Sequence, residues 1–137
     1  MAPQRLVILG VAESDAHAVA NRLIAMHLSQ AGFEVVNLGT CTPLADFAAA
    51  LRRHPTAEAV LIGSLNGHAY ADLRDLPALR AEGELRCPVV VGGNLAVGVD
   101  RSADARRRLL ELGVDRVLTD AAELVPLLDS LRPKVAV

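Results

Sequence analysis

An aspartate and a histidine two positions apart are the side chains of this sequence best placed to do chemistry. Asp15 and His17 belong to the run Ser14-Asp15-Ala16-His17, in a polar stretch that follows the apolar run Leu6–Val11. A neutral imidazole binds a metal through one ring nitrogen and donates its other N–H to an acceptor, which a nearby carboxylate can supply. The spacing therefore indicates a metal ligand held by its neighbour. The alternative is a solvated loop histidine beside an unrelated aspartate, which is the more frequent origin of such a pair.

The remaining histidines offer little help in building a conventional metal site. His27 falls within a predicted helix and is expected at its surface, and His54 follows another predicted helix, whose C-terminus it can favour. His68 lies in a loop and can approach a ligand there, although a loop histidine is more often polar surface. Zinc needs three or four protein donors. A metal that takes a single histidine must bring its other ligands with it, and that description fits a macrocyclic cofactor.

Small and polar residues follow two further apolar runs. After Ala59–Ile62 comes Gly63-Ser64-Leu65-Asn66-Gly67, and after Val89–Val91 comes Gly92-Gly93-Asn94-Leu95-Ala96-Val97-Gly98. Glycines at the end of a buried strand let a ligand approach the backbone closely. Ordinary turns favour the same residue types.

The apolar runs alternate with amphipathic stretches along the whole chain. We expect strands at Leu6–Val11, Phe33–Leu38, Ala59–Ile62, Val89–Val91 and Arg116–Leu118. We expect helices at Val19–Ala31, Leu44–Arg53, Ala71–Ala81, Ser102–Leu112 and Ala121–Leu131. Thr42 is expected to cap the second helix with Pro43 as its first residue, Pro77 to bend or split the third, and Pro126 to distort the start of the last.

This alternation predicts one α/β domain over residues 1–137, doubly wound and flavodoxin-like (Rossmann-like). Its five-stranded parallel sheet would have the order 2-1-3-4-5 with helices on both faces. Ligands of such sheets bind outside the carboxyl ends of the strands, at the switch point between the first and third strands. The segments Ala12–Ala18, Gly63–Tyr70 and Gly92–Asp100 are therefore expected on one rim.

Composition excludes several classes of function. The chain is 52% hydrophobic and 22% charged, with a formal net charge of −2, which fits neither a disordered chain nor a binder of polyanions. With no Trp and one Tyr, stacking on nucleic-acid bases is disfavoured. No apolar run is long enough to span a membrane, and Met1–Arg5 lacks the apolar run of a signal peptide.

The residues needed for several other kinds of site are absent, both from the sequence and from the loop that contains Asp15 and His17. The single lysine is Lys134, so a P-loop lysine, a Schiff-base lysine and the helper lysine of a receiver domain are all excluded. A GxGxxG fingerprint is absent, and the loop is acidic where a flavin-phosphate site is rich in Ser, Thr and Gly. Cys41 and Cys87 lie far apart without a CxxC spacing, and we expect them to be reduced thiols of a cytoplasmic protein.

Together these segments resemble the B12-binding domains, and within them the small, cobalamin-binding subunit of glutamate mutase (methylaspartate mutase). That family has the pattern Asp-x-His-x-x-Gly, then Ser-x-Leu, then Gly-Gly. Here it reads Asp15-Ala16-His17-Ala18-Val19-Ala20, Gly63-Ser64-Leu65 and Gly92-Gly93, with further likeness in Ala31–Gly39 and Val91–Asn94. The resemblance covers essentially the whole chain. Two positions depart from it: Ala20 replaces the glycine, and Gly63 replaces a serine whose hydroxyl helps to hold the base of the nucleotide tail.

The resemblance implies that His17 is the lower axial ligand of cobalt, in the base-off, His-on form, with Asp15 accepting its other ring N–H. The displaced nucleotide tail would enter a slot lined by Ser64, Leu65, Gly92 and Gly93, with Asn94–Gly98 toward its outer end. Ser14 and Ala18 would flank the corrin-binding loop. The full implied set of cofactor-binding residues is Ser14, Asp15, Ala16, His17, Ala18, Gly63, Ser64, Leu65, Gly92, Gly93, Asn94, Leu95, Ala96, Val97 and Gly98, with His17 the metal ligand and no other catalytic residue in this chain.

The implied reaction is the adenosylcobalamin-dependent radical isomerisation of L-glutamate to threo-3-methyl-L-aspartate. A large barrel subunit would bind the glutamate, in a heterotetramer of two small and two large subunits. Arg106-Arg107-Arg108 fall on a predicted helix and are expected to be a solvated face and not a substrate clamp. Two alternatives stay open, a stand-alone corrinoid carrier and a cobalamin-responsive regulator. Such proteins usually carry a helical segment before the domain, for which a strand starting at Leu6 leaves little room.

Overall fold

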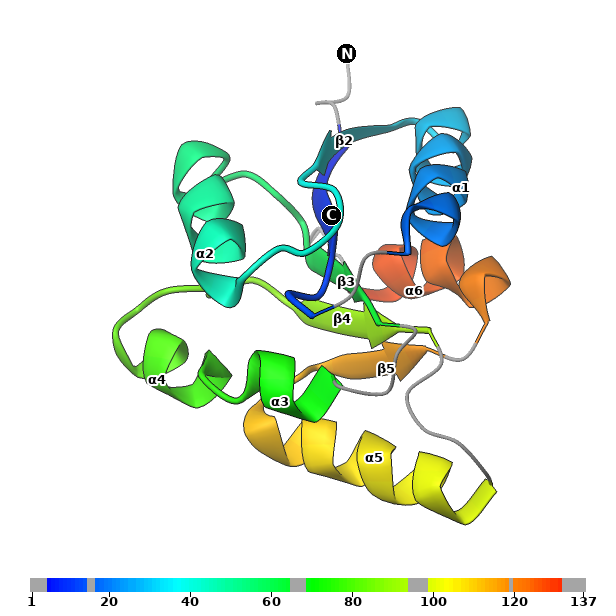
Figure 1. Ribbon diagram of the computed structural model, residues 1–137. Helices are drawn as coiled ribbons and strands as arrows, with labels where there is room; N and C mark the ends of the chain where they lie inside the picture. Colours follow the sequence, from blue (N-terminus) through cyan, green and yellow to red (C-terminus); the bar gives the residue numbers. More distant parts are fainter. Residues whose placement is uncertain (1–4, 15–16, 65–68, 94–98, 119, 132–137) are drawn as a thin grey trace.

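A parallel sheet with helices on both faces forms the molecule (Figure 1). The computed structural model describes residues 5–14, 17–64, 69–93, 99–118 and 120–131, with the side chains of 99–103 left aside. Within these ranges the strands are β1 (Arg5–Val11), β2 (Phe33–Asn37), β3 (Val60–Gly63), β4 (Val89–Gly92) and β5 (Arg116–Leu118). They pair in parallel in the order β2-β1-β3-β4-β5. The predicted fold class and strand order are confirmed.

The helices divide into two layers. On one face of the sheet lie α1 (Ala18–Gln30) and α6 (Leu124–Leu131), on the right of Figure 1. On the other face lie α2 (Leu44–Arg53), α3 (Ala69–Leu73), α4 (Leu76–Ala81) and α5 (Val99–Leu112). A short 3-10 turn, η1 (Ala121–Glu123), precedes α6. None of the helices in the described ranges is long and apolar enough to cross a bilayer.

Each strand of the interior contributes to both layers, because alternate side chains point to opposite faces. Val7 and Leu9 of β1 pack under α1 and α6, whereas Ile8 packs with Phe47 of α2 on the other side. All four side chains are at most 2% exposed. This two-sided burial explains why the strands read as unbroken apolar runs in the sequence.

The prolines act on the helices largely as expected. The predicted helix Ala71–Ala81 is split into α3 and α4. Pro77 lies in the first turn of α4, where backbone N–H groups have no acceptor within the helix, so a residue without an N–H costs no hydrogen bond there. The segment that leads to Pro126 begins as a 3-10 turn, whose Ala122 N–H is capped by the Asp120 side chain at 2.9 Å.

The predicted cap of the second helix is wrong. Pro43 and not Thr42 occupies the N-cap position of α2, and no side chain caps that helix end. The hydroxyl of Thr42 instead donates to the carbonyl of Gly39 at 3.1 Å, and its N–H donates to the carbonyl of Val11 at 2.9 Å. Thr42 therefore joins the loop after β2 to the end of β1, a tertiary contact that competes with capping.

Gly10, the residue before the last of β1, is required by the packing of the α2 face. A Cβ at this position would stand 2.7 Å from Cζ of Phe47, whose side chain is completely buried. We expect Gly10→Ala to lower the free energy of unfolding by about 1–3 kcal/mol, the usual cost of overpacking, as measured by urea titration. Gly92→Ala is the matched control, because its nearest neighbour would be at 3.6 Å. Equal unfolding midpoints for the two variants would contradict this reading of Phe47.

The two cysteines are free thiols, as expected, and they differ in environment. Cys41 is exposed, whereas burial raises the pKa of Cys87 to about 11 from an ordinary value of 9.0. At pH 8 a disulfide reagent such as DTNB should therefore label Cys41 rapidly and Cys87 slowly, because only the thiolate reacts. Comparable rates for both thiols would contradict the assignment.

The same shift gives an alkaline dependence of stability. The folded thiol of Cys87 holds its proton more tightly than the unfolded thiol, so its stabilising contribution is present below pH 9 and is lost as the pH rises through about 11. The urea midpoint of the wild type should fall more steeply between pH 9 and 11 than that of Cys87→Ala. Parallel pH profiles would exclude this group as the cause.

Candidate functional site

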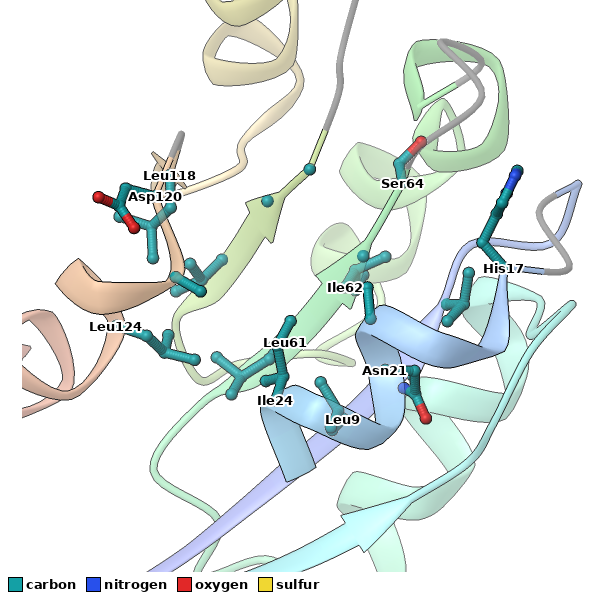
Figure 2. Close-up of a pocket in the computed structure, with 18 residues that line it drawn as sticks. Leu9, His17, Asn21, Ile24, Leu61, Ile62, Ser64, Leu118, Asp120 and Leu124 are labelled. Atoms are coloured by element: carbon teal, nitrogen blue, oxygen red, sulfur yellow. The ribbon is translucent and has the colours of Figure 1, made fainter. Parts of the chain in front are cut away.

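A cavity of about 220 Å³ opens where β1, β3 and β4 end, on the face covered by α1 and α6 (Figure 2). Its walls are mainly aliphatic. They include Leu9, Ile24, Leu61, Val90, Leu118 and Leu124. The cavity therefore lies at the predicted switch point, between the two helices of one layer.

Two glycines side by side leave the floor of the cavity without side chains. Gly63 of β3 pairs with Gly92 of β4, and both belong to the row that faces α1 and α6, between Val11 of β1 and Leu118 of β5. A Cβ built on Gly63 or Gly92 would meet no heavy atom nearer than 3.6 Å. A ligand can therefore lie directly on the backbone of these two strands.

Two buried polar atoms at this cavity lack a partner within the described part of the chain. They are Oγ of Ser64, which is 0% exposed, and Nδ2 of Asn21, which is 6% exposed. Leaving such a group buried and unpaired costs about 1–3 kcal/mol. Both residues line the cavity, so a ligand with polar atoms at these places would satisfy them. The slot is thus apolar, open to the backbone and provided with two hydrogen-bonding groups, which fits a flat, partly polar ligand.

His17 lies at the mouth of the cavity. It is the N-cap residue of α1, with extended backbone (φ −77°, ψ 98°), and its side chain does not cap the helix. Figure 2 shows its imidazole standing at the start of α1, on the same rim as Ser64. The residue is exposed, so the ring can reach a ligand that covers the opening.

Ser14 is hydrogen-bonded to helix α3. Ser14 donates both its N–H, at 3.3 Å, and its hydroxyl, at 2.6 Å, to Oδ2 of Asp72 on α3. This double contact holds the beginning of the loop against α3, on the side of the opening away from α1.

The structure brings together part of the predicted site. His17, Gly63, Ser64, Gly92 and Gly93 all line the cavity. Ser14 and Ala18 are exposed and do not line it. Asp15, Ala16, Leu65, His68 and the segment Asn94–Gly98 lie outside the described residues.

His27 and His54 lie away from the cavity, as predicted. His27 is exposed in the last turn of α1, and His54 is the C-cap residue of α2. Neither lines the cavity.

Comparison with known proteins agrees with this geometry. Residues 5–129 match the family model of the B12 binding domain. The chain is 42% identical over 127 residues to glutamate mutase sigma subunit 1 of Haloarcula marismortui, covering 90% of this chain and 83% of that protein. It is 36% identical over 115 residues to the glutamate mutase sigma subunit of Clostridium cochlearium, with 83% of each chain covered.

The chain belongs to the B12-binding domain family, among the glutamate mutase sigma subunits.

Solved structures share the fold of this family member. A cobalamin-binding protein from Desulfitobacterium hafniense superposes with a TM-score of 0.76 at 24% identity, covering 95% of this chain and 60% of that one. The monomethylamine corrinoid protein of Methanosarcina barkeri gives 0.75 at 23% identity, covering 95% and 59%. At these identities the likeness concerns the fold.

Both departures from the family pattern line the cavity, Gly63 on its floor and Ala20 on the wall formed by α1. Ala20 replaces the family glycine, is half-buried in the first turn of α1 and lines the slot. Its methyl group therefore both narrows the slot and favours the helix over glycine.

Several cavity residues were missed in the sequence. Asn21 follows His17 by four positions, and Ile24 and Leu28 continue this helical spacing along the chain. This spacing could have indicated that Asn21 lies on the buried face of the helix. Leu118, Asp120, Ala121 and Leu124 form the opposite wall. They carry no motif, and only the pairing of Gly92 with Leu118 brings them to the site.

Proposed function

We propose that this chain is the cobalamin-binding subunit of an adenosylcobalamin-dependent glutamate mutase, an isomerase that converts L-glutamate to threo-3-methyl-L-aspartate together with a large catalytic subunit. One observation carries the proposal: His17 stands at the mouth of an apolar slot whose floor is the glycine pair Gly63 and Gly92. Membership of the sigma subunits supports the choice of reaction.

Within this proposal each side chain has a simple task. His17 would hold cobalt through one ring nitrogen, and Asp15 would accept the N–H of the other nitrogen, which would fix the tautomer. The slot over Gly63 and Gly92 would hold the nucleotide tail of the cofactor. Ser64 offers its buried hydroxyl to that tail. The family pattern would assign Gly93, Leu65 and the segment 94–98 to the outer end of the tail, and Ser14, Ala16 and Ala18 to the corrin.

When bound, the cofactor would supply the radical chemistry that the isomerisation requires. This chain contributes position and shielding. The aliphatic walls of the slot would shield the bound cofactor, and His17 is anchored through its backbone at the N-cap of α1.

We assign recognition of L-glutamate to the large subunit. A dicarboxylate needs convergent arginines in a closed site, whereas Arg106, Arg107 and Arg108 of α5 are all exposed. Arg107 pairs with Asp104 and Glu111 on its own helix, and Arg108 stacks over the ring of Tyr70 at 3.9 Å. We propose an assembly of two small and two large subunits, a single domain over residues 1–137 and a cytoplasmic location, which the free thiols support.

The test is reconstitution. The purified chain, adenosylcobalamin and the large subunit of a glutamate mutase are mixed, and formation of 3-methylaspartate from L-glutamate is followed. We expect turnover only when all three are present. Turnover by this chain with the cofactor alone would contradict the division of labour, and absence of turnover with an active large subunit would contradict the assigned reaction.

A second candidate is a stand-alone corrinoid carrier without mutase activity. The monomethylamine corrinoid protein has this fold, so the fold alone does not separate the two candidates. Cobalamin binding with a histidine on cobalt, but no turnover with an active large subunit, would select this candidate.

A further inference from the structure

Asn21 is a polar residue of the cavity that is not part of the family pattern. It lies one helical turn beyond His17 on α1, as Figure 2 shows, and lines the same cavity. Residues four apart on a helix share one face. The side chain is 6% exposed, and its Nδ2 has no hydrogen-bond partner within the described residues. Nδ2 of Asn21 is thus a buried hydrogen-bond donor at the cavity.

The orientation of this amide is fixed by a chain of hydrogen bonds that starts at the backbone. The N–H of Gly39, which can only donate, donates to Oδ1 of Asn37 at 3.0 Å. Nδ2 of Asn37 is therefore turned the other way and donates to Oδ1 of Asn21 at 2.8 Å. Because Oδ1 of Asn21 is occupied in this way, its Nδ2 is the atom left for the cavity. The site therefore presents a donor and not an acceptor.

The surroundings specify the kind of acceptor. Aliphatic side chains dominate the walls, and Asp120 on the opposite wall adds a carboxylate. An apolar cavity with a carboxylate at its edge disfavours a phosphate and favours a neutral acceptor on a flat apolar ring. A benzimidazole base that has left the metal has such an acceptor, its ring nitrogen. The family position for a hydroxyl donor to the base is Gly63 in this chain, which has no side chain to offer.

We propose that Asn21, oriented by Asn37 and the N–H of Gly39, donates the hydrogen bond that holds the ring nitrogen of the displaced nucleotide base. The proposal rests on the proposed function and refines it. Ser64 is a less selective partner, because a hydroxyl both donates and accepts. The start of helix α1 would then provide two contacts to the cofactor, His17 to cobalt and Asn21 to the nucleotide base that His17 displaces.

The test compares isosteric variants and two ligands. Asn21→Asp exchanges the donor for an acceptor. Asn37→Asp, outside the cavity lining, leaves no donor toward Asn21 and should turn that amide so that Nδ2 faces position 37. Gln30→Glu is the matched control, the same amide-to-carboxylate change at an exposed position of α1. Affinity is measured by equilibrium dialysis for cobalamin and for a cobamide whose base is a phenol, which has no ring nitrogen.

We expect Asn21→Asp and Asn37→Asp each to weaken cobalamin binding about tenfold, the value of one buried hydrogen bond, and Gln30→Glu to leave it unchanged. Binding of the phenolic cobamide should change by less than about twofold in every variant, because it offers no acceptor. Cobalamin should also shift the side-chain amide resonances of Asn21 in a ¹⁵N–¹H spectrum of the wild type. Asn21→Leu, judged by the same ratio of the two ligands, replaces Asn21→Asp if the latter does not fold.

Wild-type affinity for cobalamin in both aspartate variants would overturn the proposal, as would an equal loss for the phenolic cobamide. These outcomes differ from a failure of the proposed function, in which the wild type itself binds cobalamin without a histidine nitrogen on cobalt.

Discussion

His17→Ala is expected to reduce turnover of the reconstituted mutase by about 100-fold or more, because it removes the only protein atom proposed to bind the cobalt. Loss of residues that merely orient a metal ligand costs 10- to 100-fold in affinity or activity, so loss of the ligand itself should cost at least as much. The variant should fold normally, since the His17 side chain is exposed and does not cap α1. The measurement is the rate of 3-methylaspartate formation at saturating large subunit.

His27→Ala is the matched control for this prediction. His27 lies on the same helix, is exposed and does not line the cavity, so its loss should leave turnover unchanged. If His17→Ala kept the rate of His27→Ala under saturating cofactor, His17 would not be the cobalt ligand.

Gly63→Val should close the floor of the slot and weaken cobalamin binding by about 10- to 100-fold. The added side chain would project toward α1 and α6, into the space that the glycine pair leaves open, and overpacking of this kind costs about 1–3 kcal/mol in the complex. The protein itself should lose little stability. Valine suits a strand, and the atom nearest to a Cβ at position 63 is the carbonyl oxygen of Gly10, at 3.9 Å. Equilibrium dialysis and urea titration measure the two effects separately.

Gly10→Ala is the control, because it is expected to change stability and not cobalamin affinity. Gly10 also lines the cavity, but its added methyl group would point to Phe47 on the other face of the sheet. The variant should therefore be less stable, while its folded fraction keeps its affinity for cobalamin. Undiminished cobalamin affinity in Gly63→Val would show that the ligand does not lie on β3.

The fold was accessible from sequence because burial on both faces leaves a distinct record. Runs such as Leu6–Val11 and Val89–Val91 are apolar throughout, and both became central strands. Boundaries were less certain where contacts between distant segments decide them. Thr42 is a preferred residue type for an N-cap, yet its N–H donates to the carbonyl of Val11 on β1, and its hydroxyl donates to Gly39 within the loop. Helix α5 begins at Val99, three residues before the predicted Ser102.

The site was only partly accessible for a related reason. His17, Gly63 and Gly92 follow from a topological rule that places strand ends together, and all three line the cavity. Asn21 and the wall formed by Leu118 and Leu124 depend on register and on how α1 and α6 pack against the sheet. A polar residue on a helix is usually solvated, and only the bond from Asn37 shows that the amide of Asn21 is buried and oriented.

Whether His17 binds cobalt is measured most directly by electron paramagnetic resonance of the Co(II) form of cobalamin bound to the chain, prepared with ¹⁵N-labelled histidine. Coordination by His17 predicts that the label changes the nitrogen splitting of the cobalt signal, and that His17→Ala abolishes the effect of the label. A splitting that is the same with and without the label, with the nitrogen of the nucleotide base still on cobalt, would contradict the proposed site.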